Sequence, residues 1–269
     1  MLGPQLYALR DECGGPLQAH QYTGPIWSSG GIARELDAAL AHPDRLIVLE
    51  HGARPDVVLG VPHHAPVGVD RIALERPQGS RIADENAVLY ALVCFSALEQ
   101  HGVGCRLVVA SQARDHDPNK DGASPYCRAA LADGTRVLVE CHGAGARAPH
   151  DLELSAGRNR LAKPLAVGRS LAAALGAGFH VAAQTHPGTA HALLVDAHGR
   201  ESPTVLRFPA LRTGSLLEAA SRGIAALHLE AKLRFRSAGP RNGAPTASGE
   251  RLGRALAQVL AGSVADAMR

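Results

Sequence analysis

Short runs of apolar residues recur along the chain and predict the strands of a sheet. The clearest runs lie at 45–49, 56–61, 105–110, 136–141 and 224–230, with shorter candidates at 179–183 and 192–195. Most of these runs are continuously apolar rather than alternating with polar residues, which is typical of strands covered on both faces. The 56–61 strand is expected to end at Pro62, because proline cannot donate to the ladder.

Between these runs, apolar residues three or four positions apart predict helices. The predicted helices lie at 32–41, 83–101, 165–175, 216–223 and 248–268. In the helix at 83–101, Asp84 is placed to cap the first turn and Glu85 to lie within it. Residues 1–30 show no clear period and predict an irregular arm or an edge strand. The composition of 237–247 predicts a loop.

Alternating strands and helices predict an α/β protein with a mainly parallel sheet covered by helices on both faces. The 269 residues are 46% hydrophobic, which is enough for a large core. No compositional break divides the chain, so residues 1–269 are expected to form a single domain.

Charge and cysteine content narrow the function classes. The formal net charge is +3 with scattered basic residues, and aromatic residues make up 3% of the chain. These features argue against a surface that follows a nucleic-acid backbone and stacks on bases. No apolar run approaches about 18 residues, and the start resembles no export signal. The five cysteines form no CxxC motif, so we expect reduced thiols in a soluble cytoplasmic protein with no membrane partner.

Polar residues follow several of the predicted strands, where α/β proteins place their ligands. They are the pair His63-His64, the segment 115–120, His142 before a glycine-rich turn, and Glu230. Glu85 joins them at the start of a helix, where backbone amides favour a carboxylate. Two histidines and a carboxylate form the donor set of a catalytic zinc site, and a further carboxylate can transfer protons.

The order of these motifs resembles that of zinc carboxypeptidases and their deacylase relatives, and it is most similar to the N-formylglutamate amidohydrolase-like branch. The resemblance covers about residues 57–236. Its motifs are Pro62-His63, Asp117-Pro118-Asn119-Lys120, Glu140-Cys141-His142, Asp151-Leu152-Glu153-Leu154-Ser155 and His228-Leu229-Glu230.

This resemblance implies a three-layer α/β/α fold, one bound Zn²⁺ and hydrolysis of an amide bond next to a carboxylate. The metal ligands it implies are His63, Glu85 and His142, and Glu230 is the implied general base and acid. The substrate, a small molecule or short peptide with a carboxylate, is assigned to Asn119 and Lys120, with Arg158 as a further candidate.

Some assignments stay open at this stage. The superfamily's tight His-x-x-Glu motif is absent, so Glu85 is chosen by motif order alone, with Asp84 as its alternative. His64 is the alternative to His63. Lys120 stands where the family has arginine, and an ammonium group grips a carboxylate less specifically than a guanidinium group. The oligomeric state and the particular amide are not predicted.

Three rival functions remain. The chain could be a non-catalytic protein that binds a small anion on the same fold, or a carboxypeptidase-type exopeptidase. Cys141, beside His142, raises the third possibility of a cysteine amidase. Neighbours along a strand point to opposite faces of the sheet, however, so Cys141 and His142 are poorly placed to pair.

Overall fold

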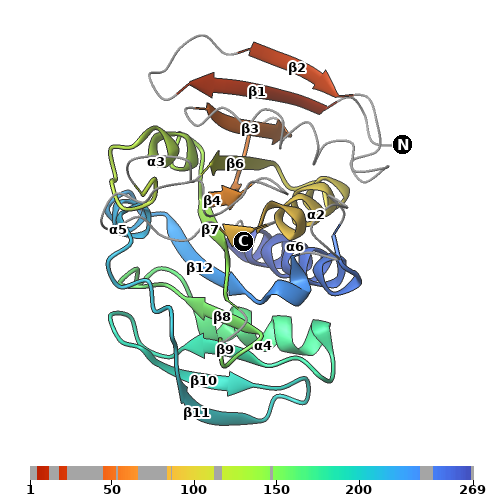
Figure 1. Ribbon diagram of the computed structural model, residues 1–269, viewed down its shortest axis with the longest axis vertical. Coiled ribbons are helices and arrows are strands. Elements are labelled where there is room, and N and C mark those ends of the chain that lie inside the picture. Colours follow the sequence, from red (N-terminus) through yellow and green to blue (C-terminus); the bar gives the residue numbers. More distant parts are fainter. Residues whose placement is uncertain are drawn as a thin grey trace.

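The apolar runs form one twelve-stranded sheet that crosses the whole molecule (Figure 1). The computed structural model describes residues 5–11, 18–22, 45–52, 54–65, 84–85, 87–111, 117–145, 148–236 and 245–267. The strands are β1 Gln5–Asp11, β2 Gln18–Tyr22, β3 Arg45–His51, β4 Val57–Ala65, β5 Asp84–Glu85, β6 Cys105–Ser111, β7 Val137–Gly143, β8 Leu152–Ser155, β9 Val181–Gln184, β10 His191–Val195, β11 Glu201–Val205 and β12 Ala225–Ala231.

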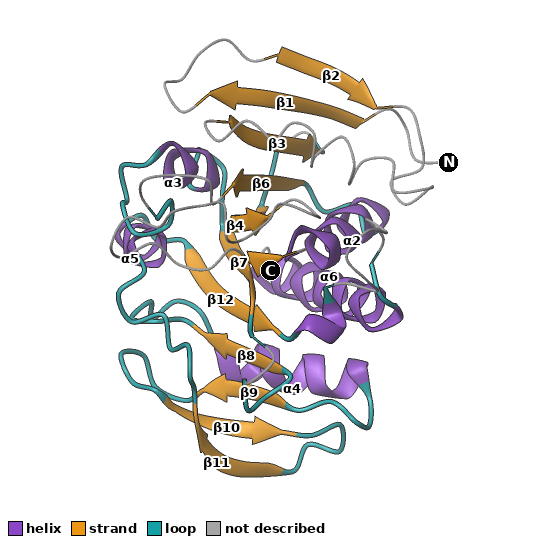
Figure 2. Ribbon diagram, in the orientation of Figure 1, coloured by secondary structure: helices purple, strands orange, loops and turns teal. Residues whose placement is uncertain are grey.

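The helices are α2 Ala87–Gln100, α3 Pro125–Ala130, α4 Pro164–Leu175, α5 Gly214–Ser221 and α6 Ala247–Ala267, with a short 3₁₀ helix, η2, at Leu233–Phe235. Helices α2, α4 and α6 pack on one face of the sheet, and α3 and α5 pack on the other (Figure 2). The predicted α/β class and its three layers are therefore confirmed. None of the helices in the described ranges is long and apolar enough to cross a membrane.

The sheet is parallel at its centre and antiparallel on both flanks. Its strand order is β11-β10-β9-β8-β12-β7-β4-β6-β3-β1-β2, with β5 added beside β4. Strands β12, β7, β4 and β6 run parallel to one another, as do β8 and β9, whereas β3 and β8 join the central strands antiparallel. Four central strands thus present their carboxyl ends at one edge, which is where α/β folds place ligands.

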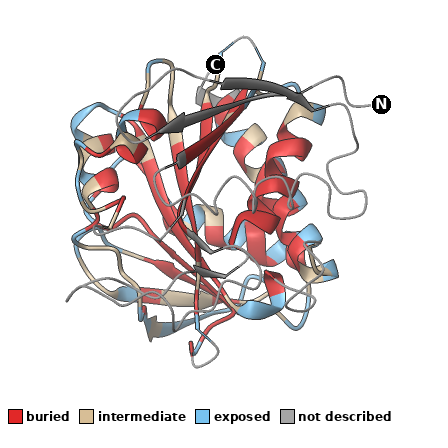
Figure 3. Ribbon diagram, turned by 45° about the horizontal axis from the view of Figure 1, so that its top comes forward, coloured by how far each residue is buried: buried red, intermediate tan, exposed pale blue. Residues whose placement is uncertain are grey.

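Alternation along the central strands divides the core into two layers. Leu138 of β7 packs with Ala226 of β12 beneath α3 and α5. Val139 and Cys141 of β7 face the opposite layer, formed with α2 and α6. Buried residues run along the strands and the helices packed against them (Figure 3), and every residue of α2 from Ala87 to Leu98 is buried. The same alternation continues to the carboxyl end of each central strand, so successive side chains there also point to opposite faces of the sheet.

Most predicted strands and helices in the described ranges are present, with shifted ends. The strand at 45–49 extends to His51, the helix at 165–175 begins at Pro164, and the last helix runs from Ala247 to Ala267. Residues 5–11 and 18–22 form strands at one sheet edge, so the irregular interpretation of 1–30 is wrong there and the edge-strand alternative is right. The predicted helix at 32–41 and most of the loop at 237–247 lie outside the described residues.

Two local predictions beside the candidate site were wrong. The strand that was expected to end at Pro62 continues to Ala65, and its register against β6 shifts between Val61 and His64. A bulge of this kind accommodates a proline that cannot take part in the ladder. The helix expected to start at residue 83 starts at Ala87, so Glu85 lies on β5 rather than in a helical first turn.

Close packing of α2 against α6 depends on a glycine. A Cβ atom built on Gly253 would lie 2.5 Å from Val93 Cβ and 2.7 Å from the carbonyl oxygen of Tyr90. We expect Gly253→Ala to lower the free energy of unfolding by about 1–3 kcal/mol, because neither backbone nor β-carbon can move away easily. Urea unfolding would measure the change. Gly262→Ala is the control on the same helix, since a Cβ atom at Gly262 would have no neighbouring atom within 4 Å. Alanine there should be neutral or stabilising.

Candidate active site

Four polar side chains lie on one face of two neighbouring strands. The parallel register sets Glu140 of β7 beside His228 of β12, and His142 beside Glu230. Glu140 and His142 are two residues apart on β7, and so are His228 and Glu230 on β12. All four side chains therefore point to the face of the sheet that α3 and α5 cover. All four are buried, with 0 to 5% of each residue exposed. The register between two strands thus builds a polar group at the end of an apolar layer.

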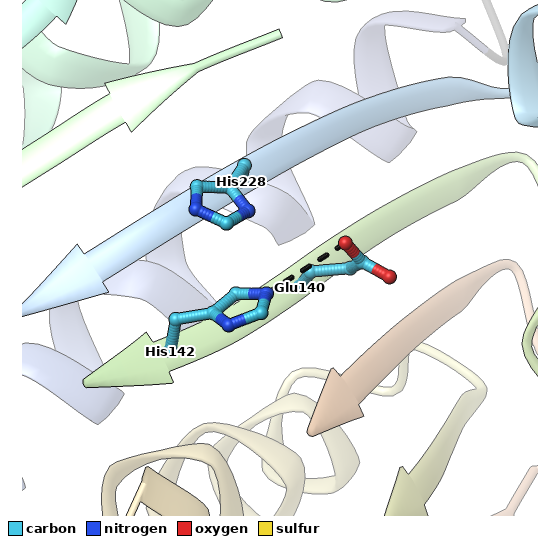
Figure 4. A group of neighbouring side chains, drawn as sticks. All are labelled: Glu140, His142 and His228. Atoms are coloured by element: carbon cyan, nitrogen blue, oxygen red, sulfur yellow. Dashed lines mark ion pairs between the residues drawn. The ribbon is translucent and has the colours of Figure 1, made fainter. Parts of the chain in front are cut away.

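Glu140, His142 and His228 form a compact group that offers ligand atoms within 4.8 Å of one another (Figure 4). The ring centroids of His142 and His228 are 4.1 Å apart. His142 Nε2 lies 3.7 Å from Glu140 Oε2, and His228 Nε2 lies 3.0 Å from Glu230 Oε1. Two histidines and a carboxylate in this arrangement are a donor set that suits Zn²⁺.

His63 joins this group from β4. Its ring meets the ring of His142 edge to face, with 4.9 Å between centroids. Its Nε2 lies 2.7 Å from Asp117 Oδ1, and the side chain is 3% exposed. The continuation of β4 through Pro62 carries His63 to this position. His142 therefore contacts a histidine ring on either side, one from each neighbouring central strand.

Each of the three histidines directs Nε2 toward a carboxylate. The pairs are His63 with Asp117, His142 with Glu140 and His228 with Glu230. For His63 and His228, whose Nε2 atoms lie 2.7 Å and 3.0 Å from a carboxylate oxygen, this contact favours the tautomer with its proton on Nε2 and leaves the Nδ1 lone pair for a metal. His142 Nε2 lies 3.7 Å from Glu140 Oε2 and 3.5 Å from Asn119 Nδ2. Such histidine–carboxylate pairs are typical of metal sites, because the carboxylate orients the ring and raises its basicity.

The chemistry of Glu140 supports its ionised form. Burial by itself raises the pKa of Glu140, but hydrogen bonds and the charges of His142 and His228 outweigh it and leave the pKa below its usual value. Oε1 accepts hydrogen bonds from Ser215 Oγ at 2.6 Å and Tyr126 Oη at 3.0 Å, and Oε2 accepts one from Asn119 Nδ2 at 3.2 Å. A fully buried carboxylate with this many donors is held as an anion.

Asp117 is held as an anion in the same way. Burial raises its pKa, but the hydrogen bond and charge of His63, followed by the charge of Lys120, lower it to about 2. The carboxylate is partly exposed, whereas His63 beside it is buried. Asp117 therefore accepts the hydrogen bond from His63 over the ordinary pH range.

A glycine on β4 makes room for one of these hydrogen bonds. Gly60 pairs with Glu140 across the sheet, and a Cβ atom at Gly60 would lie 2.1 Å from Tyr126 Oη. Any side chain at Gly60 would displace the tyrosine that donates to Glu140. Gly60 therefore belongs to the support of the site although it carries no reactive group.

The structure brings together only part of the residue set that the sequence suggested. His63, His142, Glu230 and Asn119 lie within one buried group. Lys120 is adjacent, and its Nζ donates to Thr213 Oγ1 at 3.4 Å. Arg158 is exposed on the turn after β8. It does not line the cavity that Lys120, His228 and residues 207–213 form beside this group. The side chains of Glu85, Asp84 and His64 lie outside the described residues, so these assignments remain predictions.

Sequence reasoning gave no role to three residues of this group, namely Asp117, Glu140 and His228. All three occur inside motifs that were recognised for their neighbours. Alternation along a strand is the signal that could have found two of them, because Glu140 shares the face of His142 and His228 shares the face of Glu230. Asp117 lies on a turn between elements, and only the tertiary fold brings it to His63.

Cys141 lies on the other face of β7, as alternation predicts. It is fully buried among the core residues beneath α2 and α6. Burial raises the pKa of the Cys141 thiol to about 12, and a thiol is a poor nucleophile without its thiolate form. The arrangement gives no support to a cysteine amidase.

We expect iodoacetamide to leave Cys141 unmodified in the folded protein, together with the other buried thiols Cys94, Cys105 and Cys127. Peptide mass mapping after a timed reaction would measure the modification, and protein denatured in guanidinium provides the fully reactive control. Rapid labelling of Cys141 in the folded protein, with parallel loss of activity, would restore the cysteine hypothesis.

No protein-family model matches this sequence, and neither does any curated protein. Solved structures show a distant likeness. A metallo-carboxypeptidase from Pseudomonas aeruginosa has 13% identity and a TM-score of 0.43, with 99% of this chain and 82% of that chain covered. A metallo-carboxypeptidase from Burkholderia cenocepacia has 14% identity and a TM-score of 0.44, with 84% and 62% covered.

An N-formylglutamate amidohydrolase from Ralstonia eutropha has 12% identity and a TM-score of 0.46, with 82% of this chain and 98% of that chain covered. The chain thus spans less than two thirds of the Burkholderia protein and nearly all of the Ralstonia protein. At this distance, a function for the chain has to rest on the side chains of its own site.

Proposed function

We propose that this chain is a zinc-dependent hydrolase that cleaves an amide bond in an acidic N-acyl amino acid or peptide. The observation that carries the proposal is the set of three buried histidines, each with Nε2 directed at a carboxylate and with His142 between the other two. A purely structural core has no need for three such pairs, and burying five ionisable groups beside the partly exposed Asp117 is costly unless they serve a ligand.

The donor set fits a zinc ion. We assign His63 and His142 to the metal, with Glu85 as the third ligand that the family resemblance implies. An alternative ligand set consists of Glu140, His142 and His228. The hydrogen bonds that Glu140 already accepts from Ser215 and Tyr126 favour instead a role in orienting His142. A bound Zn²⁺ would supply a Lewis acid that acidifies water and polarises the substrate carbonyl.

Glu230 is the group that we propose takes a proton from water and delivers it to the leaving amine. It lies beside His142 in the register of β7 and β12, at the carboxyl end of its strand. Its hydrogen bond with His228 holds Oε1, so the carboxylate has a fixed orientation rather than the freedom of a surface glutamate. A positioned carboxylate of this kind typically contributes about 10²–10⁴-fold to the rate.

One observation favours a second function. A cavity beside His228 is lined by Lys120 and two arginines, and a non-catalytic protein could use it to hold a small anion. Such a protein would bind an anion without binding zinc and without turnover. An exopeptidase would use the same metal donors as the amidohydrolase and would differ only in the substrates that it cleaves.

Metal removal tests the proposed function. We expect the purified protein to contain about one zinc ion per chain by elemental analysis, and dialysis against a chelator to remove both metal and activity. Adding Zn²⁺ back should restore activity. Substrates would be screened in the same assay, with N-acyl acidic amino acids compared against short peptides ending in a free carboxylate. Protein that stays free of metal in zinc-supplemented buffer would contradict the proposal.

A further inference from the structure

A cavity of about 400 Å³ opens beside the histidine group. His228 forms part of its wall, and the remaining wall comes from Lys120 and the loop at 207–213. This volume lies in the range of small-molecule sites, about 300–1,000 Å³. The cavity therefore has the size and position to hold the part of a substrate next to the scissile bond.

The loop at 207–213 is fixed in place by buried polar groups on β8. Glu153 Oε2 accepts hydrogen bonds from the backbone amides of Arg207 at 2.9 Å and Phe208 at 3.0 Å. Ser155 Oγ donates to the carbonyl oxygen of Pro209 at 2.9 Å. Because Glu153 is 1% exposed and Ser155 is fully buried, the loop is bonded to the sheet itself rather than to another surface segment.

The middle of the loop adopts a conformation that most residues avoid. Ala210 has a φ of 50°, in the left-handed region, where residues with a β-carbon are uncommon. Its carbonyl oxygen lies against Gly157, whose own φ is 55°, and a Cβ atom at Gly157 would approach that oxygen to 2.5 Å. Backbone strain of this kind persists where the surroundings impose it, and it is concentrated at functional sites.

The charge of the cavity wall has one sign. Lys120, Arg207 and Arg212 are cationic, and no aspartate or glutamate is found among the described residues that line the cavity. Both arginines are exposed, and the guanidinium carbon of Arg207 lies 5.6 Å from the ring centroid of Phe208. A loop that contributes two arginines to a cavity wall shared with a lysine is complementary to an anion, and a guanidinium group can grip a carboxylate with two parallel hydrogen bonds.

We propose that Arg207 and Arg212 are specificity-determining residues that bind a negatively charged group of the substrate in this cavity. With Lys120 they give the cavity enough positive charge to hold two carboxylates at once. This assignment rests on the proposed function, and it does not include Arg158, which does not line the cavity and stays a prediction from the sequence. It adds the loop at 207–213 to the site, a segment that none of the sequence motifs includes.

Glutarate is a suitable probe, because it carries two carboxylates and no amide bond. Calorimetric titration of the 269-residue chain should show saturable glutarate binding, with butyrate at least about tenfold weaker. Arg207→Gln and Arg212→Gln should each weaken glutarate binding by roughly 10- to 100-fold, and Arg212→Lys should fall between wild type and Arg212→Gln. Arg200→Gln is the matched control, since this arginine is exposed, pairs with Asp196 in the turn between β10 and β11, and does not line the cavity.

Two results would overturn the assignment: equal binding of glutarate and butyrate, or full glutarate affinity in both glutamine variants. Titrations with chelator-treated protein separate this question from catalysis. Loss of glutarate binding in the arginine variants, in protein that never binds zinc, would support the anion site and contradict the hydrolase. The opposite result is zinc content and turnover that stay intact, with a KM that neither arginine variant changes. It would support the hydrolase and contradict the anion site.

Discussion

Replacing Glu230 by glutamine is expected to lower kcat by about two to four orders of magnitude while the protein keeps its metal. Glutamine has the size and one of the hydrogen-bonding functions of glutamate, so it can still accept a hydrogen bond from His228. It cannot take up a proton, and the proposed transfer from water to the leaving amine depends on that step. KM should change far less than kcat, because the substrate is bound by other groups.

Steady-state kinetics and elemental analysis on the same preparation would check this result. Glu250→Gln is the control, since Glu250 is an exposed carboxylate in the first turn of α6. Wild-type turnover in Glu230→Gln would remove this residue from the mechanism. Loss of zinc along with activity would instead make Glu230 part of the metal site.

His142→Ala is expected to abolish stoichiometric zinc binding and with it the activity. The His142 ring lies between His63 and His228. It belongs to the group of Glu140, His142 and His228 that the described residues form, and also to the proposed ligand set that includes Glu85. Its removal takes a ligand from each set. Zinc content after dialysis against a weak chelator would measure the loss.

The same substitution should also destabilise the fold. Glu140 is fully buried and would lose the histidine that most favours its ionised form, a penalty of about 1–3 kcal/mol. His142→Gln keeps a polar group beside Glu140 and should be better folded, yet equally poor in zinc. His198→Ala is the control, because His198 is exposed on the turn before β11. Full zinc occupancy in a folded His142→Gln would contradict the assignment.

Much of this site was predictable from the sequence because strands have a period of two. The run before His142 identified a buried strand, and the period placed Cys141 and His142 on opposite faces, as β7 has them. The rule that ligands gather at the carboxyl ends of parallel strands put His63, His142 and Glu230 in one region. The structure agrees for these three.

The predictions that failed involve backbone choices with competing local signals. Asp84 and Glu85 have the composition of a helix start, yet they add a short strand beside β4, because pairing with an open strand competes with local helix preference. Pro62 is a strand breaker by composition, and a bulge lets β4 pass through it. Strands β8 and β11 and the short helix α3 were missed. None of the three contains the continuous apolar run from which the other strands were predicted.

The opposite faces of Cys141 and His142 follow from the sequence by itself, because alternation is a local property of the backbone. The same holds for the shared face of Glu140 and His142. The register that sets β7 against β12 depends on packing between segments far apart in the chain, and only the folded structure decides it. The pairing of His63 with Asp117 and the position of the loop at 207–213 beside His228 likewise depend on contacts between segments far apart in the chain. The sequence thus determined which residues could react, and the tertiary structure decided which of them meet.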